Sequence, residues 1–188
     1  MADTGTTSLK KQEIIDQAYR LFYDGGFHAT GVDTVMAGTG ISKRTLYKYF
    51  PSKEHLIEAV LAKYAGDVSE MLFKAAAARS DDPRKQIRAL FEVRREAMDG
   101  NACQGCLAVK AAGEYAGKHA GITHIGERSI REIEDRFIEL CTRAGLADPV
   151  LRGRQINLLF QGTGLVAQLH GKTEAFDAAL AALDMFLA

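Results

Sequence analysis

The chain has 188 residues, 47% of them hydrophobic and 26% charged, which is enough to bury the core of one large domain or of two smaller ones. Its net charge is zero, its three cysteines are too few for a disulfide framework, and no run of about 18 apolar residues could span a membrane. The N-terminus lacks the basic-then-apolar pattern of a secretion signal, so we expect a cytoplasmic protein.

Helix start and stop signals predict three helices in the first third of the chain. Ser8 is expected to cap the first helix, which should end at a glycine pair beginning at residue 25. Thr30, with Asp33 three residues later, predicts a capping box for a short second helix. Ser42 is expected to cap a third short helix, which the following proline ends.

The rest of the chain shows helical spacing throughout. Ser52 predicts the start of a long fourth helix. The later helices are expected at roughly 83–99, 103–118, 122–144, 148–171 and 173–187. Because no segment alternates with a period of two, the predicted fold class is all-α with about nine helices. A three-helix domain at 1–51 should precede a helical bundle at 52–188.

Positive charge is concentrated on the third predicted helix. Residues 41–55 carry four basic residues and one acidic residue. A helical projection places Leu46 and Phe50 on the inward face, where they would hold the helix against the first two. The side chains turned outward are Arg44, Thr45, Tyr47 and Lys48. A short helix with so many outward cations and tyrosines indicates contact with DNA, although a merely solvated face is the alternative.

The outward residues match the chemistry of a DNA groove. Lys43, Arg44 and Thr45 lie near the helix start and are the expected base contacts, because Arg and Lys donate to guanine and Thr offers a hydroxyl or a methyl group. The expected phosphate contacts are Tyr47, Tyr49 and Lys53.

Three segments together resemble the N-terminal signature of the TetR family of bacterial transcription regulators. They are Thr30-Gly-Val-Asp33, Gly40-Ile-Ser-Lys-Arg-Thr-Leu-Tyr-Lys-Tyr-Phe50 and Ser52-Lys-Glu-His-Leu56. The resemblance implies a helix-turn-helix DNA-binding domain at 1–51 and a ligand-binding and dimerisation domain at 52–188. It also implies a homodimer that represses from a palindromic operator and releases it when a small-molecule effector binds. The resemblance implies phosphate contacts at Tyr47, Tyr49 and Lys53 and places Thr30 and Gly31 beside the DNA backbone. Together with the outward face of the third helix, the predicted DNA-binding residues are Thr30, Lys43, Arg44, Thr45, Tyr47, Lys48, Tyr49 and Lys53.

Two positions depart from the pattern of that family. A small alanine is usual where Met36 stands, and a hydroxyl residue is usual where Gly31 stands. The first change affects the packing of the second helix on the third, and the second removes one expected phosphate contact.

The last two predicted helices carry apolar stripes that favour a dimer interface. The predicted interface residues are Leu158, Gly162, Leu165, Leu169 and Leu183. Glycines inside a helix cost about 1 kcal/mol each relative to alanine, so Gly162 and Gly164 indicate a close helix approach. The alternative is that both helices only cover the core of their own monomer.

The segment around Cys103-Gln-Gly-Cys106 offers candidate ligand-binding residues. The candidates are Cys103, Cys106, Glu114, Tyr115 and His119. A zinc site would need two more nearby ligands, and none follows at suitable spacing, so no metal is expected. A thiol sensor and purely structural cysteines both remain open.

Tests for catalytic motifs fail. A phosphate-binding loop ending at Lys172 would need glycine where Val166 stands, and no Glu-x-x-His pair exists for a di-iron site. No enzyme activity and no cofactor are therefore expected. The sequence favours a ligand-responsive repressor, and the alternative is a helical small-molecule or thiol-sensing binding protein with little DNA binding.

Overall fold

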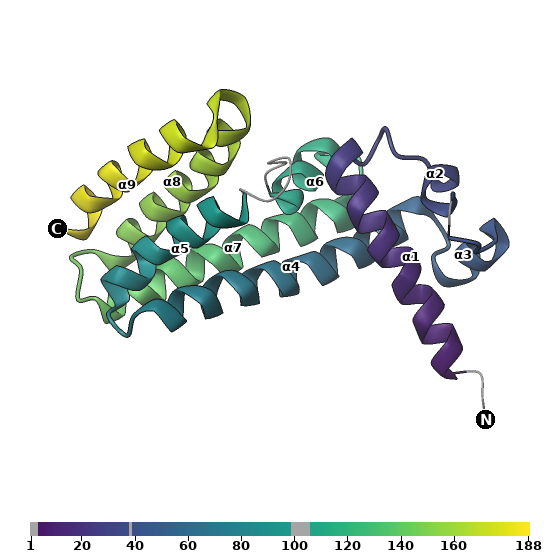
Figure 1. Ribbon diagram of the computed structural model, residues 1–188, viewed down its shortest axis with the longest axis horizontal. Coiled ribbons are helices and arrows are strands. Elements are labelled where there is room, and N and C mark those ends of the chain that lie inside the picture. Colours follow the sequence, from purple (N-terminus) through teal and green to yellow (C-terminus); the bar gives the residue numbers. More distant parts are fainter. Residues whose placement is uncertain (1–3, 38, 99–105) are drawn as a thin grey trace. The chain divides into compact units, whose positions relative to one another are not determined.

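The computed structural model describes residues 4–37, 39–98 and 106–188. Nine α-helices account for most of these residues and none of them forms a strand, which confirms the predicted all-α class (Figure 1). The helices are α1 (Thr4–Gly25), α2 (Val32–Met36), α3 (Lys43–Tyr49), α4 (Lys53–Arg79), α5 (Pro83–Ala97), α6 (Leu107–Tyr115), α7 (Ala120–Arg143), α8 (Pro149–His170) and α9 (Lys172–Leu187). No described helix is long and apolar enough to cross a bilayer.

The caps of two helices differ from the prediction. α1 begins at Thr4, so Ser8 lies inside the helix. α2 has Gly31 as its N-cap, without a side-chain capping bond. The Thr30 hydroxyl instead donates to the carbonyl oxygen of Leu21 at 3.2 Å, so the capping box predicted for Thr30 and Asp33 is wrong. The cap at Ser42 forms as predicted.

The chain divides into two compact units, each built from two stretches. Unit 1 contains Met1–Ala65 and Leu107–Glu127, and unit 2 contains Gly66–Cys106 and Arg128–Ala188. α4 and α7 each contribute residues to both units. The functional boundary expected after residue 51 stays a prediction, because compactness alone does not locate DNA or ligand binding.

Unit 1 is organised around the mutual packing of α1, α2 and α3. Its core includes Ile14 and Phe22 from α1, Val35 from α2 and Leu46 from α3, none of which is exposed to solvent. A helix as short as α3 is marginal in isolation, so this packing is what keeps it formed.

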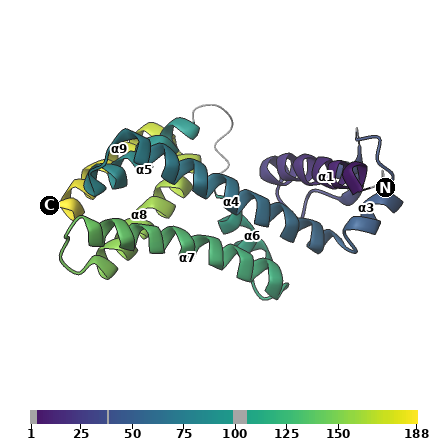
Figure 2. The same ribbon diagram turned by 90° about the horizontal axis from the view of Figure 1, so that it is seen from below.

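Unit 2 has an aromatic core. The rings of Phe91, Phe137 and Phe160 meet with centroids 5.1–6.4 Å apart. α8 lies against α9, and α5 also packs on α9 (Figures 1 and 2). Two glycines of α8 permit close approach, because a side chain at Gly153 would overlap the backbone of Ile138 and one at Gly164 would overlap the Arg94 guanidinium.

Candidate nucleic-acid interface

α3 is fixed at both ends and along its inner face. The Ser42 hydroxyl accepts a hydrogen bond from the Thr45 backbone N–H at 3.2 Å. Leu46 is fully buried and Phe50, the C-cap, is 2% exposed. These contacts determine which side of α3 faces solvent, as the helical projection predicted.

The outer face of α3 carries most of the predicted DNA-binding side chains. Arg44, Tyr47 and Lys48 are exposed, while Thr45 and Tyr49 are half-buried. Lys53, the first residue of α4, is also half-buried and follows α3 by only three residues. The structure therefore brings these predicted residues together on and directly after α3.

Two predicted base contacts already have intramolecular partners. The Lys43 ammonium lies 2.7 Å from Asp33 Oδ1 on α2, and this hydrogen bond raises the pKa of Lys43 above its ordinary value. The Thr45 hydroxyl lies 2.9 Å from the Ser42 hydroxyl. Arg44 has no such partner among the described residues, so it is the most available donor in the first turn of α3.

Thr30 does not occupy the predicted position. Its side chain is 5% exposed, and its hydroxyl donates a hydrogen bond to the Leu21 carbonyl oxygen. The hydroxyl could donate to a phosphate only if this hydrogen bond were broken. Gly31 is exposed at the start of α2, and Met36 is half-buried. The expectation that Thr30 contacts DNA through its side chain is therefore corrected.

The basic side chains of unit 1 fall into two groups. One group is engaged with oxygen atoms of the protein, and its members are Arg20, Lys43, Lys63, Lys110 and Lys118. The other group forms neither a hydrogen bond nor an ion pair with a described residue, and its members are Lys10, Lys11, Arg44, Lys48 and Lys53. Three of these five cations belong to the predicted site on α3 and α4. The sequence prediction did not include the other two, because pairing is visible only in the folded unit.

The comparisons with known proteins agree with this geometry. The family model "Bacterial regulatory proteins, tetR family" matches residues 14–60, which include all of α2 and α3. The chain is 37% identical over 84 residues to the uncharacterised HTH-type transcriptional regulator YxaF of Bacillus subtilis, a match covering 44% of this chain and 43% of YxaF. It is 30% identical over 99 residues to the HTH-type transcriptional repressor KstR2 of Rhodococcus jostii, covering 53% of this chain and 48% of KstR2.

Residues 14–60 of the chain therefore match the TetR family of bacterial regulatory proteins. The fold of the chain is also similar to that of SCO4454, a TetR-family transcriptional regulator from Streptomyces coelicolor, with a TM-score of 0.87, 24% identity and coverage of 96% of this chain and 95% of that chain. At this identity the likeness establishes the fold. The matched stretch spans less than half the length of each curated relative named above.

The TetR-like chain exposes an apolar stripe on α8. Leu158 is 73% exposed, Leu165 58% and Leu169 71%. Gly162 lies between them and has nothing within 4 Å of where a Cβ atom would stand. Leu183 does not join this surface, because its side chain is fully buried in the unit 2 core.

Most of the candidate ligand-binding residues have structural contacts instead. The Glu114 carboxylate accepts hydrogen bonds from the backbone N–H groups of Phe27, at 3.2 Å, and His28, at 2.9 Å. Tyr115 is 5% exposed and stacks on His28, and its burial raises its pKa. His119 Nδ1 accepts from the Ile122 backbone N–H at 3.3 Å, at the start of α7.

The two cysteine candidates are not brought into a described site. Cys103 lies outside the described residues, and Cys106 is half-buried immediately before α6. The described part of the chain contains no cluster of three or more His, Cys, Asp and Glu residues that could hold a metal ion.

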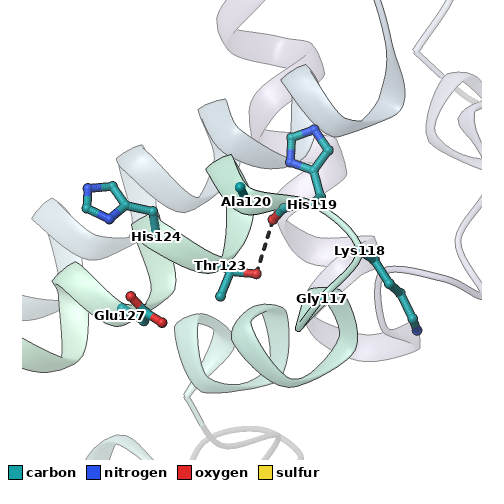
Figure 3. A pocket seen from close by; sticks show the side chains of 7 residues that line it. All are labelled: Gly117, Lys118, His119, Ala120, Thr123, His124 and Glu127. Carbon is teal, nitrogen blue, oxygen red and sulfur yellow. Dashed lines mark hydrogen bonds between the residues drawn. The ribbon is translucent and has the colours of Figure 1, made fainter.

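An open cavity of about 540 Å³ lies at the junction of α6 and α7 (Figure 3). Its lining residues are Gly117, Lys118, His119, Ala120, Thr123, His124 and Glu127. Of the candidate ligand-binding residues, only His119 contributes to it. Figure 3 shows the rings of His119 and His124 pointing in different directions, and the Thr123 hydroxyl bonded to the His119 carbonyl oxygen at 3.1 Å.

Proposed function

We propose that this chain is a DNA-binding transcriptional regulator that places α3 in the major groove. The supporting observation is the outer face of α3, where Arg44, Tyr47 and Lys48 are exposed and unpaired above the buried Leu46 and Phe50. A recognition helix of this kind contacts bases through its N-terminal residues, so Arg44 is the proposed base contact. Tyr47, Lys48 and Lys53 are the proposed phosphate contacts, which position the helix.

The proposal includes a homodimer on a palindromic operator. Two copies of a helix-turn-helix protein contact two half-sites when their two-fold axis coincides with that of the DNA. The exposed leucines of α8 supply an apolar surface of the kind that a second copy would bury. The two α8–α9 pairs would then form a four-helix interface.

The proposal also includes regulation by a small molecule. When an effector binds the C-terminal bundle, the protein would release the operator and repression would be relieved. The repressor assignment draws support from the printed name of KstR2, a relative in sequence. The chemistry of the effector is a separate question, because of the predicted ligand residues only His119 lines the described cavity of about 540 Å³.

The test is binding to the DNA upstream of its own gene, measured by fluorescence anisotropy across a salt series. We expect Kd to rise steeply with salt concentration, as phosphate contacts require. Lys48→Ala should weaken binding to all sequences, while Arg44→Ala should also alter base preference. Lys85→Ala, an exposed lysine of α5 in unit 2, is the matched control and should leave both unchanged.

The opposite result is equally clear. If no DNA fragment is retained at low salt and retention shows no salt dependence, the chain is not a DNA-binding regulator. A reporter assay then fixes the direction of regulation, since deletion of the gene raises expression from its operator if the protein represses.

A further inference from the structure

The exposed N-terminal part of α1 carries two lysines, Lys10 and Lys11, that form no ion pair with a described residue. Leu9, Lys10, Lys11, Gln12 and Glu13 are all exposed, and Leu9 is 72% exposed. Figure 1 shows this end of α1 extending beyond α2 and α3. Because none of the side chains from Leu9 to Glu13 is buried, the described core of unit 1 does not include this segment.

Lys11 is located next to α3 by a specific contact. Its Nζ atom lies 5.7 Å from the centroid of the Phe50 ring, and Phe50 is the C-cap of α3. Lys53 begins α4 three residues later. The exposed side of α1, the end of α3 and the start of α4 therefore meet around Phe50, and each contributes a cation without an ionic partner among the described residues.

No acidic group among the described residues forms an ion pair with Lys10 or Lys11. Asp16 on α1 is paired with Lys63 and also accepts from Gln12. Glu54 accepts hydrogen bonds from its own backbone N–H and from the Ser52 hydroxyl, which keep the pKa of its carboxyl below the ordinary value, and the nearby charge of Lys53 lowers this pKa further. Glu13 is exposed two residues beyond Lys11 and forms no ion pair with a described residue.

We propose that Lys10 and Lys11 bind the DNA phosphate backbone beside the groove that α3 occupies. The distribution of basic residues supports this proposal. In unit 1, the lysines and the arginine that have no hydrogen bond or ion pair with a described residue lie only on α1, on α3 and at the start of α4. An ammonium group is a suitable point charge for phosphate but carries little information about base sequence. The two lysines should therefore add affinity and not base preference. This inference rests on the proposed DNA-binding function.

The salt dependence of binding tests the inference directly. Each phosphate contact contributes about 0.9 to the slope of log K against log salt concentration on duplex DNA. The Lys10→Ala/Lys11→Ala variant removes two contacts from each protomer of the proposed dimer, so its slope should be smaller by about 3.6, with the ratio of specific to non-specific affinity unchanged. The matched control is Lys74→Ala/Lys85→Ala, which removes two exposed lysines from unit 2 and should retain the full slope.

Two further variants separate charge from packing. Lys11→Met keeps an apolar stem against Phe50 but removes the charge from both protomers, so it should lower the slope by about 1.8 while circular dichroism and oligomeric state stay unchanged. Lys10→Arg/Lys11→Arg keeps both positive charges and should therefore show the same salt slope of DNA binding as the unmodified chain.

An unchanged slope in the double alanine variant overturns this inference while leaving the proposed function intact, provided that the unmodified chain binds DNA with a steep slope. A chain with no salt-dependent DNA binding overturns both.

Discussion

The Lys43 ammonium lies 2.7 Å from Asp33 Oδ1, and this ion pair joins the first turn of α3 to α2. Both groups are exposed, with 53% and 82% of their side-chain surfaces accessible. The pair therefore restrains the base-contacting turn but contributes little to stability. In the proposed complex, its acidic member lies beside a polyanion.

Replacing Asp33 should consequently strengthen general DNA binding. Asp33→Asn removes a negative charge next to the proposed site and releases Lys43 for phosphate contact. We expect tighter binding to non-operator DNA and a salt slope larger by about 2 for the proposed dimer, with little change in melting temperature. Asp33→Asn/Lys43→Ala is the control, and it should not show the larger slope.

Glu114 should stabilise unit 1 through the connection between α1 and α2. Its carboxylate accepts from two backbone N–H groups, at Phe27, which is buried, and at His28, and these bonds are lost if the side chain is removed. Glu114→Ala should lower the free energy of unfolding by about 1–3 kcal/mol, measured by urea denaturation. Glu114→Gln, which keeps one acceptor oxygen, should lose less. The exposed Glu127→Ala is the control, and an equal loss in both variants contradicts this role.

Charge on the α8 stripe should abolish the proposed dimer. Leu158→Arg places a cation where the side chain is 73% exposed, so the isolated monomer should remain folded. In sedimentation velocity the variant should behave as a monomer, and its operator affinity should fall because the two half-sites are no longer linked. Leu9→Arg changes an equally exposed leucine on α1 and should leave the dimer intact. A dimeric Leu158→Arg protein would place the interface elsewhere.

The Cys141 thiol should be unreactive in the folded chain. Burial raises its pKa to about 11, so the thiolate that attacks disulfide reagents is scarce at pH 8. Labelling with a thiol-specific reagent followed by mass spectrometry should modify Cys106 first and Cys141 only after unfolding. Equal labelling rates for the two residues contradict this expectation.

The same pKa shift gives a direction for stability against pH. The unfolded thiol releases its proton near pH 8.5, whereas the folded one holds it up to about 11. Between these values the folded state binds more protons, so stability falls as pH rises. The contribution is fully present below pH 8.5, and Cys141→Ala should remove that part of the pH dependence.

The sequence was sufficient to predict α3 because its signals are local. A hydroxyl at Ser42, apolar residues at Leu46 and Phe50 and the following proline define its ends and its buried face without knowledge of the rest of the chain. The Thr30 capping box failed for a related reason. Its hydroxyl has an acceptor at Leu21, nine residues earlier, and a local motif cannot show which of two competing bonds forms.

Tertiary partners account for the other differences. Glu114 bonds to backbone groups 86 and 87 residues away, so nothing near it in the sequence indicates its role. In α9 both faces are apolar, and only packing decides that Leu183 is buried while Met185 is 76% exposed. The sequence also could not predict that Lys43 is paired and that Lys10 and Lys11 are not, because ion pairs between distant residues form only in the folded unit.

The two buried glycines of α8 also determine how its leucines are presented. Because Gly153 lies against Ile138 and Gly164 against Arg94, rotation of α8 about its own axis would drive neighbouring side chains into these neighbours. The direction in which Leu158 and Leu165 point is therefore set within each monomer before a second copy arrives. Association would then proceed between preformed surfaces, with little conformational entropy lost by the backbone of α8.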